Sequence, residues 1–133
     1  MTYLLDTNIC IYVIKRKPVS VVERIRTKSI DQIGVSSITL AELEHGVSKS
    51  AFPGRNRIAL VEFVTPFRIL DFGQSAAHKY GRLRSRLEQA GQVIGPLDLL
   101  IAAHAVAENL TLVTNNEREF QRIPNLKIEN WVR

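Results

Sequence analysis

Residues 3–8 read YLLDTN, and this stretch decides how the rest of the chain is interpreted. Two leucines follow a β-favouring tyrosine without polar alternation, which is typical of a short strand buried on both faces. The run stops at Asp6. Open α/β sheets form their ligand crevice at the carboxyl ends of strands, so Asp6 is a candidate for chemistry. The alternative is a helix N-cap, since an apolar run, residues 9–14, follows at once.

Length and composition favour one globular domain, residues 1–133, with a single core. Hydrophobic residues make up 45% of the chain and charged residues 23%, and the apolar runs are too short to span a bilayer. No signal peptide is recognisable, and the single Cys10 excludes an internal disulfide, so we expect a cytoplasmic protein. The net charge of +5 favours polyanionic partners without identifying one.

Strand and helix patterns alternate along the whole chain. After the first strand, further strands are expected at 32–35, 67–70, 112–114 and 126–128. Helices are expected at 7–15, 18–27, 38–47, 55–64, 74–90 and 97–108, with a short one after Asn116. This alternation predicts a three-layer α/β/α sandwich with a mainly parallel sheet of about five strands and right-handed crossovers.

Two of the expected helices carry a clear apolar pattern. In the 55–64 helix we expect Ile58 and Val61 to face the core, together with Phe63. In the 74–90 helix the core stripe is expected to comprise Ala76, Tyr80, Leu83, Leu87 and Ala90, and Gly91 is expected to end that helix.

Three further acids occupy positions that the expected sheet brings to one edge. Glu42 lies about one turn into its helix, Asp98 lies in the first turn of the 97–108 helix, and Glu119 follows Asn116 by three residues. Each has a structural alternative. Residues 39–42 match a capping box, and the helix dipole stabilises a carboxylate at the position of Asp98.

These acids together form a set of oxygen donors. Asp6, Glu42 and Asp98, with Asn116 or Glu119, supply three or four ligands, and none of the first three is a histidine or cysteine. Hard carboxylate oxygens suit Mg²⁺ or Mn²⁺ better than Zn²⁺, and Mg²⁺ retains waters that can attack a phosphate. Phosphodiester hydrolysis is therefore the expected chemistry.

The histidines do not belong to this expected site. Glu42 and His45 have the Glu-x-x-His spacing of di-iron helical bundles, but such sites need a second copy of the motif that this chain lacks. We therefore interpret His45 as a surface or supporting residue. His104 lies on a different face of its helix from Asp98 and is interpreted as packing.

Basic residues form two groups. Lys79, Arg82 and Arg86 recur at helical spacing and form a basic ridge, which we interpret either as a contact for a nucleic-acid backbone or as a solvated flank. Six basic residues and one acid lie in the run from Lys15 to Lys28, and a solvated helix face is the favoured interpretation of that run.

Four motifs, in order along the chain, carry a resemblance to a known family. They are Asp6-Thr7-Asn8 after the first strand, Glu42 within SITLAEL, the segment GPLD that ends at Asp98, and the segment VTNN at 113–116 followed by Glu119-Phe120. In order and spacing they resemble the PIN-domain ribonuclease toxins of the VapC type. The resemblance covers the whole chain.

The resemblance implies a Mg²⁺- or Mn²⁺-dependent endoribonuclease that forms homodimers and is held inactive by a VapB-like antitoxin. It implies that Asp6, Glu42 and Asp98 bind the metal. The supporting residues would be Thr7, Asn8, Thr114 and Asn116. Many family members carry an aspartate where this chain has Asn116, and Glu119 is then expected to take the role of the fourth acid.

The overall pattern is most similar to enteric-type members that cleave initiator tRNA in its anticodon stem-loop, and this substrate is implied by resemblance alone. Two other functions remain open at this stage. A haloacid-dehalogenase-like phosphatase also begins with an aspartate after the first strand, but it needs a second one at the position of Asn8. A PIN fold that binds RNA without catalysis would need no metal, and the three intact acids argue against it.

Overall fold

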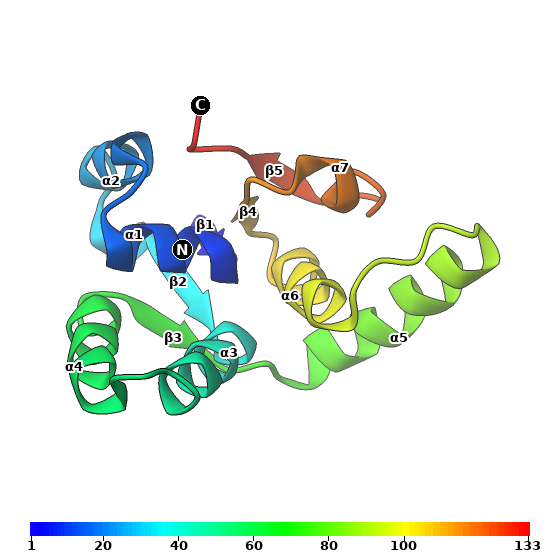
Figure 1. The fold of residues 1–133 in the computed structure, drawn as a ribbon. Coiled ribbons are helices and arrows are strands. Elements are labelled where there is room, and N and C mark those ends of the chain that lie inside the picture. Colours follow the sequence, from blue (N-terminus) through cyan, green and yellow to red (C-terminus); the bar gives the residue numbers. More distant parts are fainter.

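The computed structural model describes residues 1–133 and contains one five-stranded sheet in the order β3-β2-β1-β4-β5 (Figure 1). All four strand pairs are parallel. This confirms the expected α/β class and the mainly parallel sheet. The strands are β1 (Tyr3–Leu5), β2 (Ile33–Ser36), β3 (Arg68–Leu70), β4 (Thr111–Val113) and β5 (Lys127–Glu129).

Helices occupy every connection between strands, and each expected helix is present to within a few residues. They are α1 (Thr7–Lys15), α2 (Val19–Arg26), α3 (Ser37–Ser48), α4 (Pro53–Val64), α5 (Gln74–Gln89), α6 (Pro96–Ala107) and α7 (Glu117–Phe120), with a 3₁₀ turn at Ile30–Gln32. None of these helices has the length and apolar character that crossing a membrane requires.

The sheet separates two apolar clusters, one on each face, because neighbouring residues of a strand point to opposite sides. Leu4 pairs with Leu112 and faces the cluster that includes residues of α5 and α6. Leu5 pairs with Val35 and Val113 and faces the cluster built with α1 to α4. The two groups of helices therefore form the outer layers of the expected α/β/α sandwich (Figure 1).

Helix α4 is rotated relative to the expectation. Ile58 and Val61 are 63% and 53% exposed, so their expected core positions are wrong, whereas Phe63 is buried as expected. The buried stripe consists of Leu60 and Phe63, with Val64 packed partly beside them. Both stripes have helical spacing, so the periodicity alone could not choose between them.

Helix α5 follows its expected stripe over most of its length. Ala76, Leu83 and Leu87 are buried and Tyr80 is half-buried. The helix ends at Gln89, so Ala90 lies outside it and is exposed, contrary to expectation. Gly91 follows with a φ of +68°, the left-handed conformation that ends many helices and that glycine adopts without strain.

The strand order indicates where on the sheet a ligand would bind. From β1 at the centre, β2 and β3 extend to one side and β4 and β5 to the other. The order therefore reverses between β1 and β4, and ligands of open α/β sheets bind outside the carboxyl ends of strands at such a reversal. Asp6 follows β1 and Thr114 follows β4 directly at this point.

Candidate active site

Asp6 is both a helix cap and a member of the acidic site. It is the N-cap of α1, and its Oδ1 accepts the backbone N–H of Ile9 at 2.8 Å. Its side chain is almost wholly buried, and this burial is the main cause that raises its pKa to about 6. The charges of Asp98 and Glu42 act in the same direction, while hydrogen bonds from Thr114 and Ile9 oppose them. The cap occupies one carboxylate oxygen and leaves Oδ2 for other contacts.

Asp98 lies in the first turn of α6, whose N-cap is Gly95. Partial burial raises its pKa, and the charges of Glu119 and Glu42 raise it further. Every charged side chain that perturbs Asp6 or Asp98 is thus itself an acid. The site therefore concentrates negative charge around Asp6 and Asp98, while the positive charge of Arg122 acts on Glu119.

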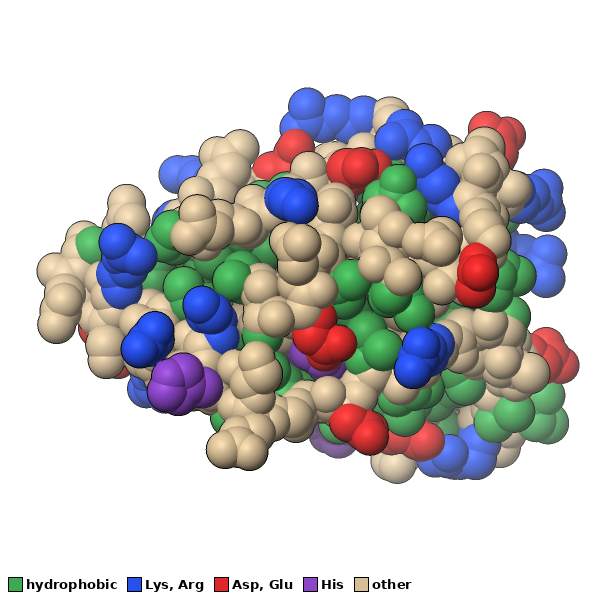
Figure 2. Space-filling view, turned by 180° about the vertical axis from the view of Figure 1, so that it is seen from behind, with side chains coloured by type: hydrophobic (Ala, Val, Ile, Leu, Met, Phe, Trp, Pro, Cys, Tyr) green, Lys and Arg blue, Asp and Glu red, His purple; other side chains and the backbone are tan.

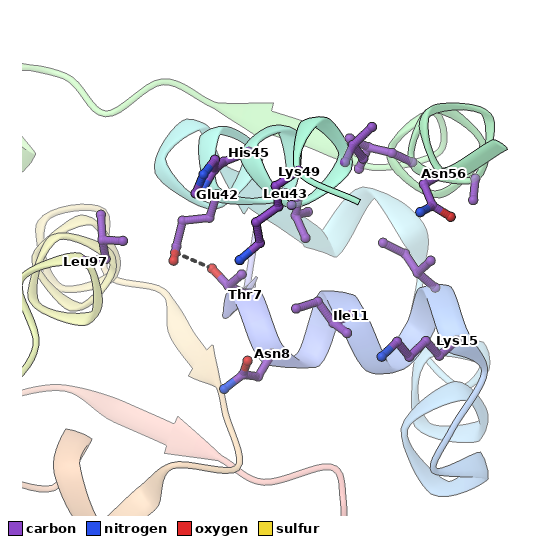
Figure 3. Close-up of a pocket in the computed structure, with 15 residues that line it drawn as sticks. Thr7, Asn8, Ile11, Lys15, Glu42, Leu43, His45, Lys49, Asn56 and Leu97 are labelled. Atoms are coloured by element: carbon purple, nitrogen blue, oxygen red, sulfur yellow. Dashed lines mark hydrogen bonds between the residues drawn. The ribbon is translucent and has the colours of Figure 1, made fainter. Parts of the chain in front are cut away.

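Glu42 does not cap its helix, so the capping-box alternative is wrong. The N-cap of α3 is Ser36, whose side chain accepts the N–H of Ile38 at 3.1 Å, and Glu42 lies further along the helix. Its Oε1 instead accepts a hydrogen bond of 2.7 Å from the hydroxyl of Thr7 on α1 (Figure 3). The hydroxyl of Thr39 is in hydrogen-bond contact with Thr7 at 3.2 Å.

Glu119 ties the short helix α7 to the start of α6. Its Oε1 accepts the backbone N–H of Gly95 at 3.1 Å, and its Oε2 accepts the side-chain amide of Asn116 at 2.7 Å. The bond from Asn116 is the main cause that lowers the pKa of Glu119, followed by the bond from Gly95. The backbone N–H of Asn116 is itself bonded to the Thr114 hydroxyl at 2.9 Å, so the segment after β4 is well ordered.

The sequence-predicted acids lie at one end of the sheet, but they do not form a preassembled cage of three or more ligands. Several of their oxygens are instead held by protein donors, as described for Asp6, Glu42 and Glu119. Carboxylates of like charge repel one another, which disfavours a tight cluster of anions by themselves. An acid-rich set of oxygen donors fits a hard divalent cation such as Mg²⁺ or Mn²⁺.

The basic ridge of Lys79, Arg82 and Arg86 lies apart from these acids. It borders a small hollow that it shares with Val106 and residues 124–125, near the carboxyl end of α6, whereas Asp98 lies at the opposite end of that helix. Figure 2 shows basic side chains and a histidine gathered over the end of the molecule formed by α5. The role of the ridge in binding RNA stays a prediction.

His104 packs in the core, as expected, and also forms a polar link that the sequence did not reveal. Its Nδ1 lies 2.8 Å from the Ser36 hydroxyl, and its Nε2 lies 2.5 Å from a carboxylate oxygen of Glu108. The ring also contacts Phe72 edge-on. His45 is exposed beside Glu42, in agreement with the surface interpretation.

A groove of about 520 Å³ opens beside Thr7 and Glu42 and runs between α1, α3 and α4 (Figure 3). Asn8 is exposed and lines it, and so do Lys15 and Lys49 from the far ends of α1 and α3. No sequence pattern indicated this groove, because Lys15 belonged to a run interpreted as a solvated helix face.

The α/β/α sandwich that carries these acids is the fold of the PIN-domain proteins. The PIN domain model matches residues 3–126, and the chain belongs to this family. The membership removes the support for a haloacid-dehalogenase-like phosphatase.

Within the family, the chain is similar to VapC ribonucleases, as the sequence motifs indicated. It is 51% identical over 132 residues to Ribonuclease VapC2 of Rickettsia felis, and the match covers 98% of each chain. It is 43% identical over 131 residues to the tRNA(fMet)-specific endonuclease VapC of Shigella flexneri, again with 98% of each chain covered.

Solved structures agree with this relationship. The structure of VapBC2 from Rickettsia felis bound to a DNA fragment from their promoter matches with a TM-score of 0.92 and 50% identity, covering 98% of this chain and 99% of that one. The DNA-bound VapBC of Salmonella typhimurium matches with a TM-score of 0.94 and 42% identity, covering 98% of both. The expected fold and family are therefore confirmed.

Proposed function

We propose that this protein is a single-domain, divalent-metal-dependent endoribonuclease that acts as the toxin of a toxin–antitoxin pair. The observation that carries this proposal is the concentration of acids at the reversal of strand order. Asp6 and Asp98 each have a pKa raised by burial and by other acids, in a chain of the PIN family. A site of this kind is suited to a cation and a phosphate ester.

Asp6, Glu42 and Asp98 are the residues that would hold the metal, with Glu119 as a fourth acid. When bound, Mg²⁺ or Mn²⁺ supplies an activated water and stabilises negative charge on the phosphate. The chain itself provides the positioning. Thr7 fixes one oxygen of Glu42, and Asn116 with Gly95 fixes both oxygens of Glu119.

The proposed substrate is the anticodon stem-loop of a tRNA, with the initiator tRNA as the first candidate. Relatives from Shigella flexneri and Salmonella typhimurium are named as tRNA(fMet)-specific endonucleases, at 43% and 42% identity. Single-stranded loops expose bases that proteins can contact individually, which suits a nuclease with an open acidic site. The basic ridge of α5 is proposed to contact the backbone of the same RNA at a distance from the acids.

The proposed partners are a VapB-like antitoxin and a second copy of the chain, and the proposed location is the bacterial cytoplasm. The similar structures from Rickettsia felis and Salmonella typhimurium are VapBC complexes, which supports the antitoxin. A single, buried, unpaired Cys10 is compatible with a reducing compartment.

The proposal is tested by the cleavage of total tRNA and of an initiator-tRNA stem-loop by the purified protein. We expect cleavage with Mg²⁺ or Mn²⁺, none with EDTA, and recovery when metal is restored. The matched control is Asp98→Asn purified in the same way, which excludes a contaminating nuclease. Binding without metal-dependent cleavage would instead support the non-catalytic RNA-binding alternative.

A further inference from the structure

The groove beside the acidic site has the dimensions and walls of a ligand site. Its volume of about 520 Å³ lies within the range of roughly 300–1,000 Å³ that is usual for small-ligand pockets. Its floor is aliphatic and comprises Ile11 from α1, Leu43 from α3 and Leu60 from α4. Polar side chains edge this floor, including the amide of Asn56, which points into the groove in Figure 3.

Two lysines line the groove, and Lys15 lies at its end away from the acids. Lys15 is the last residue of α1 and Lys49 directly follows α3. Neither forms an ion pair, whereas Arg57 pairs with Glu44 at 2.7 Å on the neighbouring surface. In Figure 3 the Lys49 side chain reaches back between α1 and α3 towards Thr7. The groove thus holds two unpaired cations.

The groove is continuous with the acidic site, since Thr7 and Glu42 belong to both. Helix α1 rises about 1.5 Å per residue, so Thr7 and Lys15 lie roughly 12 Å apart along its axis. A polyanion with its reacting phosphate near Glu42 would therefore pass Lys49, extend along the aliphatic floor and reach Lys15. Cationic side chains thus lie at both ends of the apolar floor.

We propose that this groove binds an unpaired nucleotide of the RNA next to the bond that is cut. Its base packs on Ile11, Leu43 and Leu60, and the phosphates on its two sides contact Lys49 and Lys15. This inference rests on the proposed ribonuclease function and adds to it a reason for preferring unpaired RNA: a base held in a duplex cannot leave its stack to enter the groove.

The charges favour RNA over a protein segment as the occupant. The unpaired cations face a groove whose single acid, Glu42, belongs to the catalytic end. The only aromatic ring in the walls is the imidazole of His45, so the base is held mainly by burial of its faces on aliphatic side chains, and we expect modest sequence preference. An acidic peptide of the partner antitoxin is the rival occupant, and the experiment below distinguishes it.

Gly46 provides a variant that fills the groove without breaking the fold. It lines the groove within α3, and a Cβ built at this position meets no atom within 4 Å. Gly46→Ala adds only a methyl group and removes the flexibility of a helical glycine, so it should raise Tm and leave RNA binding nearly unchanged. Gly46→Phe should keep the fold and occupy the space assigned to the base.

The test measures binding in EDTA by fluorescence anisotropy, so that no cleavage occurs. The probe is a labelled single-stranded RNA of about ten nucleotides, within the usual footprint of single-strand binders. A duplex of the same sequence and a single-stranded probe with one abasic position accompany it. We expect Gly46→Phe to weaken single-strand binding about tenfold, the effect of losing one packed base, and to leave duplex binding unchanged.

Each lysine supplies a second readout. Lys15→Ala and Lys49→Ala should each reduce the slope of log affinity against log salt by about 0.7, the value for one phosphate of a single strand. Lys127→Ala, on the edge strand β5, is the control for a general loss of charge. If the abasic position coincides with the nucleotide that enters the groove, the probe should bind the unmodified protein more weakly. The same probe should bind Gly46→Phe no more weakly than the intact single strand does.

The inference is overturned if Gly46→Phe and the two lysine variants bind single-stranded RNA like the unmodified protein. It is also overturned if Gly46→Phe abolishes antitoxin binding while RNA binding is unaffected, because the groove then belongs to the antitoxin. Failure of the ribonuclease proposal is distinguishable, since it would appear as absence of metal-dependent cleavage by the unmodified protein, whatever the anisotropy shows.

Discussion

Thr7 on α1 donates a hydrogen bond of 2.7 Å to Glu42 on α3, and this contact joins the two helices that border the groove (Figure 3). The two residues follow different strands of the sheet, β1 and β2. Hydrogen bonds to a charged group contribute about 1.5–3 kcal/mol, so this bond can hold the carboxylate in one orientation.

Replacing Thr7 should therefore affect the site through Glu42. We expect Thr7→Val to raise the Mg²⁺ concentration needed for half-maximal cleavage at least several-fold, because the carboxylate loses its donor, with a small loss of stability of about 1 kcal/mol. Thr7→Ser keeps the donor and is the matched control. Equal metal titration curves for the valine and serine variants would show that the bond does not position Glu42.

Neutralising Asp6 or Asp98 should have opposite effects on activity and on stability. We expect Asp6→Asn and Asp98→Asn each to abolish RNA cleavage and to stabilise the metal-free protein by about 0.5 to 2 kcal/mol, because like charges are removed. Asparagine at position 6 can still accept the N–H of Ile9 and cap α1. Melting curves in EDTA measure this, and a clear drop in Tm for both variants would identify the acids as structural.

The metal-free protein should lose stability as pH rises. The pKa of Asp6 rises from 3.8 in the unfolded chain to about 6 in the folded one, so the folded state binds more protons between these values. Asp6 therefore contributes roughly 2 to 3 kcal/mol to the free energy of unfolding below pH 4, and this contribution is lost as pH rises through about 6. Urea unfolding in EDTA at several pH values measures the free energy of unfolding. The difference in pH dependence between the unmodified protein and Asp6→Asn gives the part that is due to Asp6.

Variants of Glu119 and Asn116 test whether Glu119 is a fourth acid that holds the metal. We expect Glu119→Gln to raise the metal concentration needed for activity several-fold. Asn116→Asp should lower it by adding a charged ligand. Since Asn116 donates to Glu119 at 2.7 Å, the same aspartate should also destabilise the metal-free protein through like-charge repulsion. If Glu119→Gln follows the unmodified curve with both Mg²⁺ and Mn²⁺, the site has three acids.

The basic ridge gives an independent prediction about RNA. If Lys79, Arg82 and Arg86 each neutralise a phosphate, changing one to alanine should weaken binding of all RNAs alike and reduce the salt slope by about 0.7 to 1. Titrations of Asp98→Asn over a range of salt concentrations measure this without cleavage. An unchanged slope would make the ridge a solvated flank, in keeping with its distance from the acids.

Local patterns in the sequence determined the elements and the positions of the acids. The bounds of α1 agree with the expected 7–15, because Asp6 caps the helix at one end and the break before Pro18 limits it at the other. Gly91 ends α5 for an equally local reason. The acids were found because parallel strands bring their carboxyl ends to one edge, and the order of elements alone predicts such strands.

Only the tertiary structure decided which faces and side chains meet. The rotation of α4 buries Leu60 and exposes Ile58, although both belong to stripes with helical spacing. The bond from Thr7 to Glu42 spans 35 residues of sequence, and the groove that collects Lys15 and Lys49 is built from three separate helices. Periodicity describes one helix relative to its own axis, whereas these contacts depend on how helices are packed on the sheet and turned towards one another.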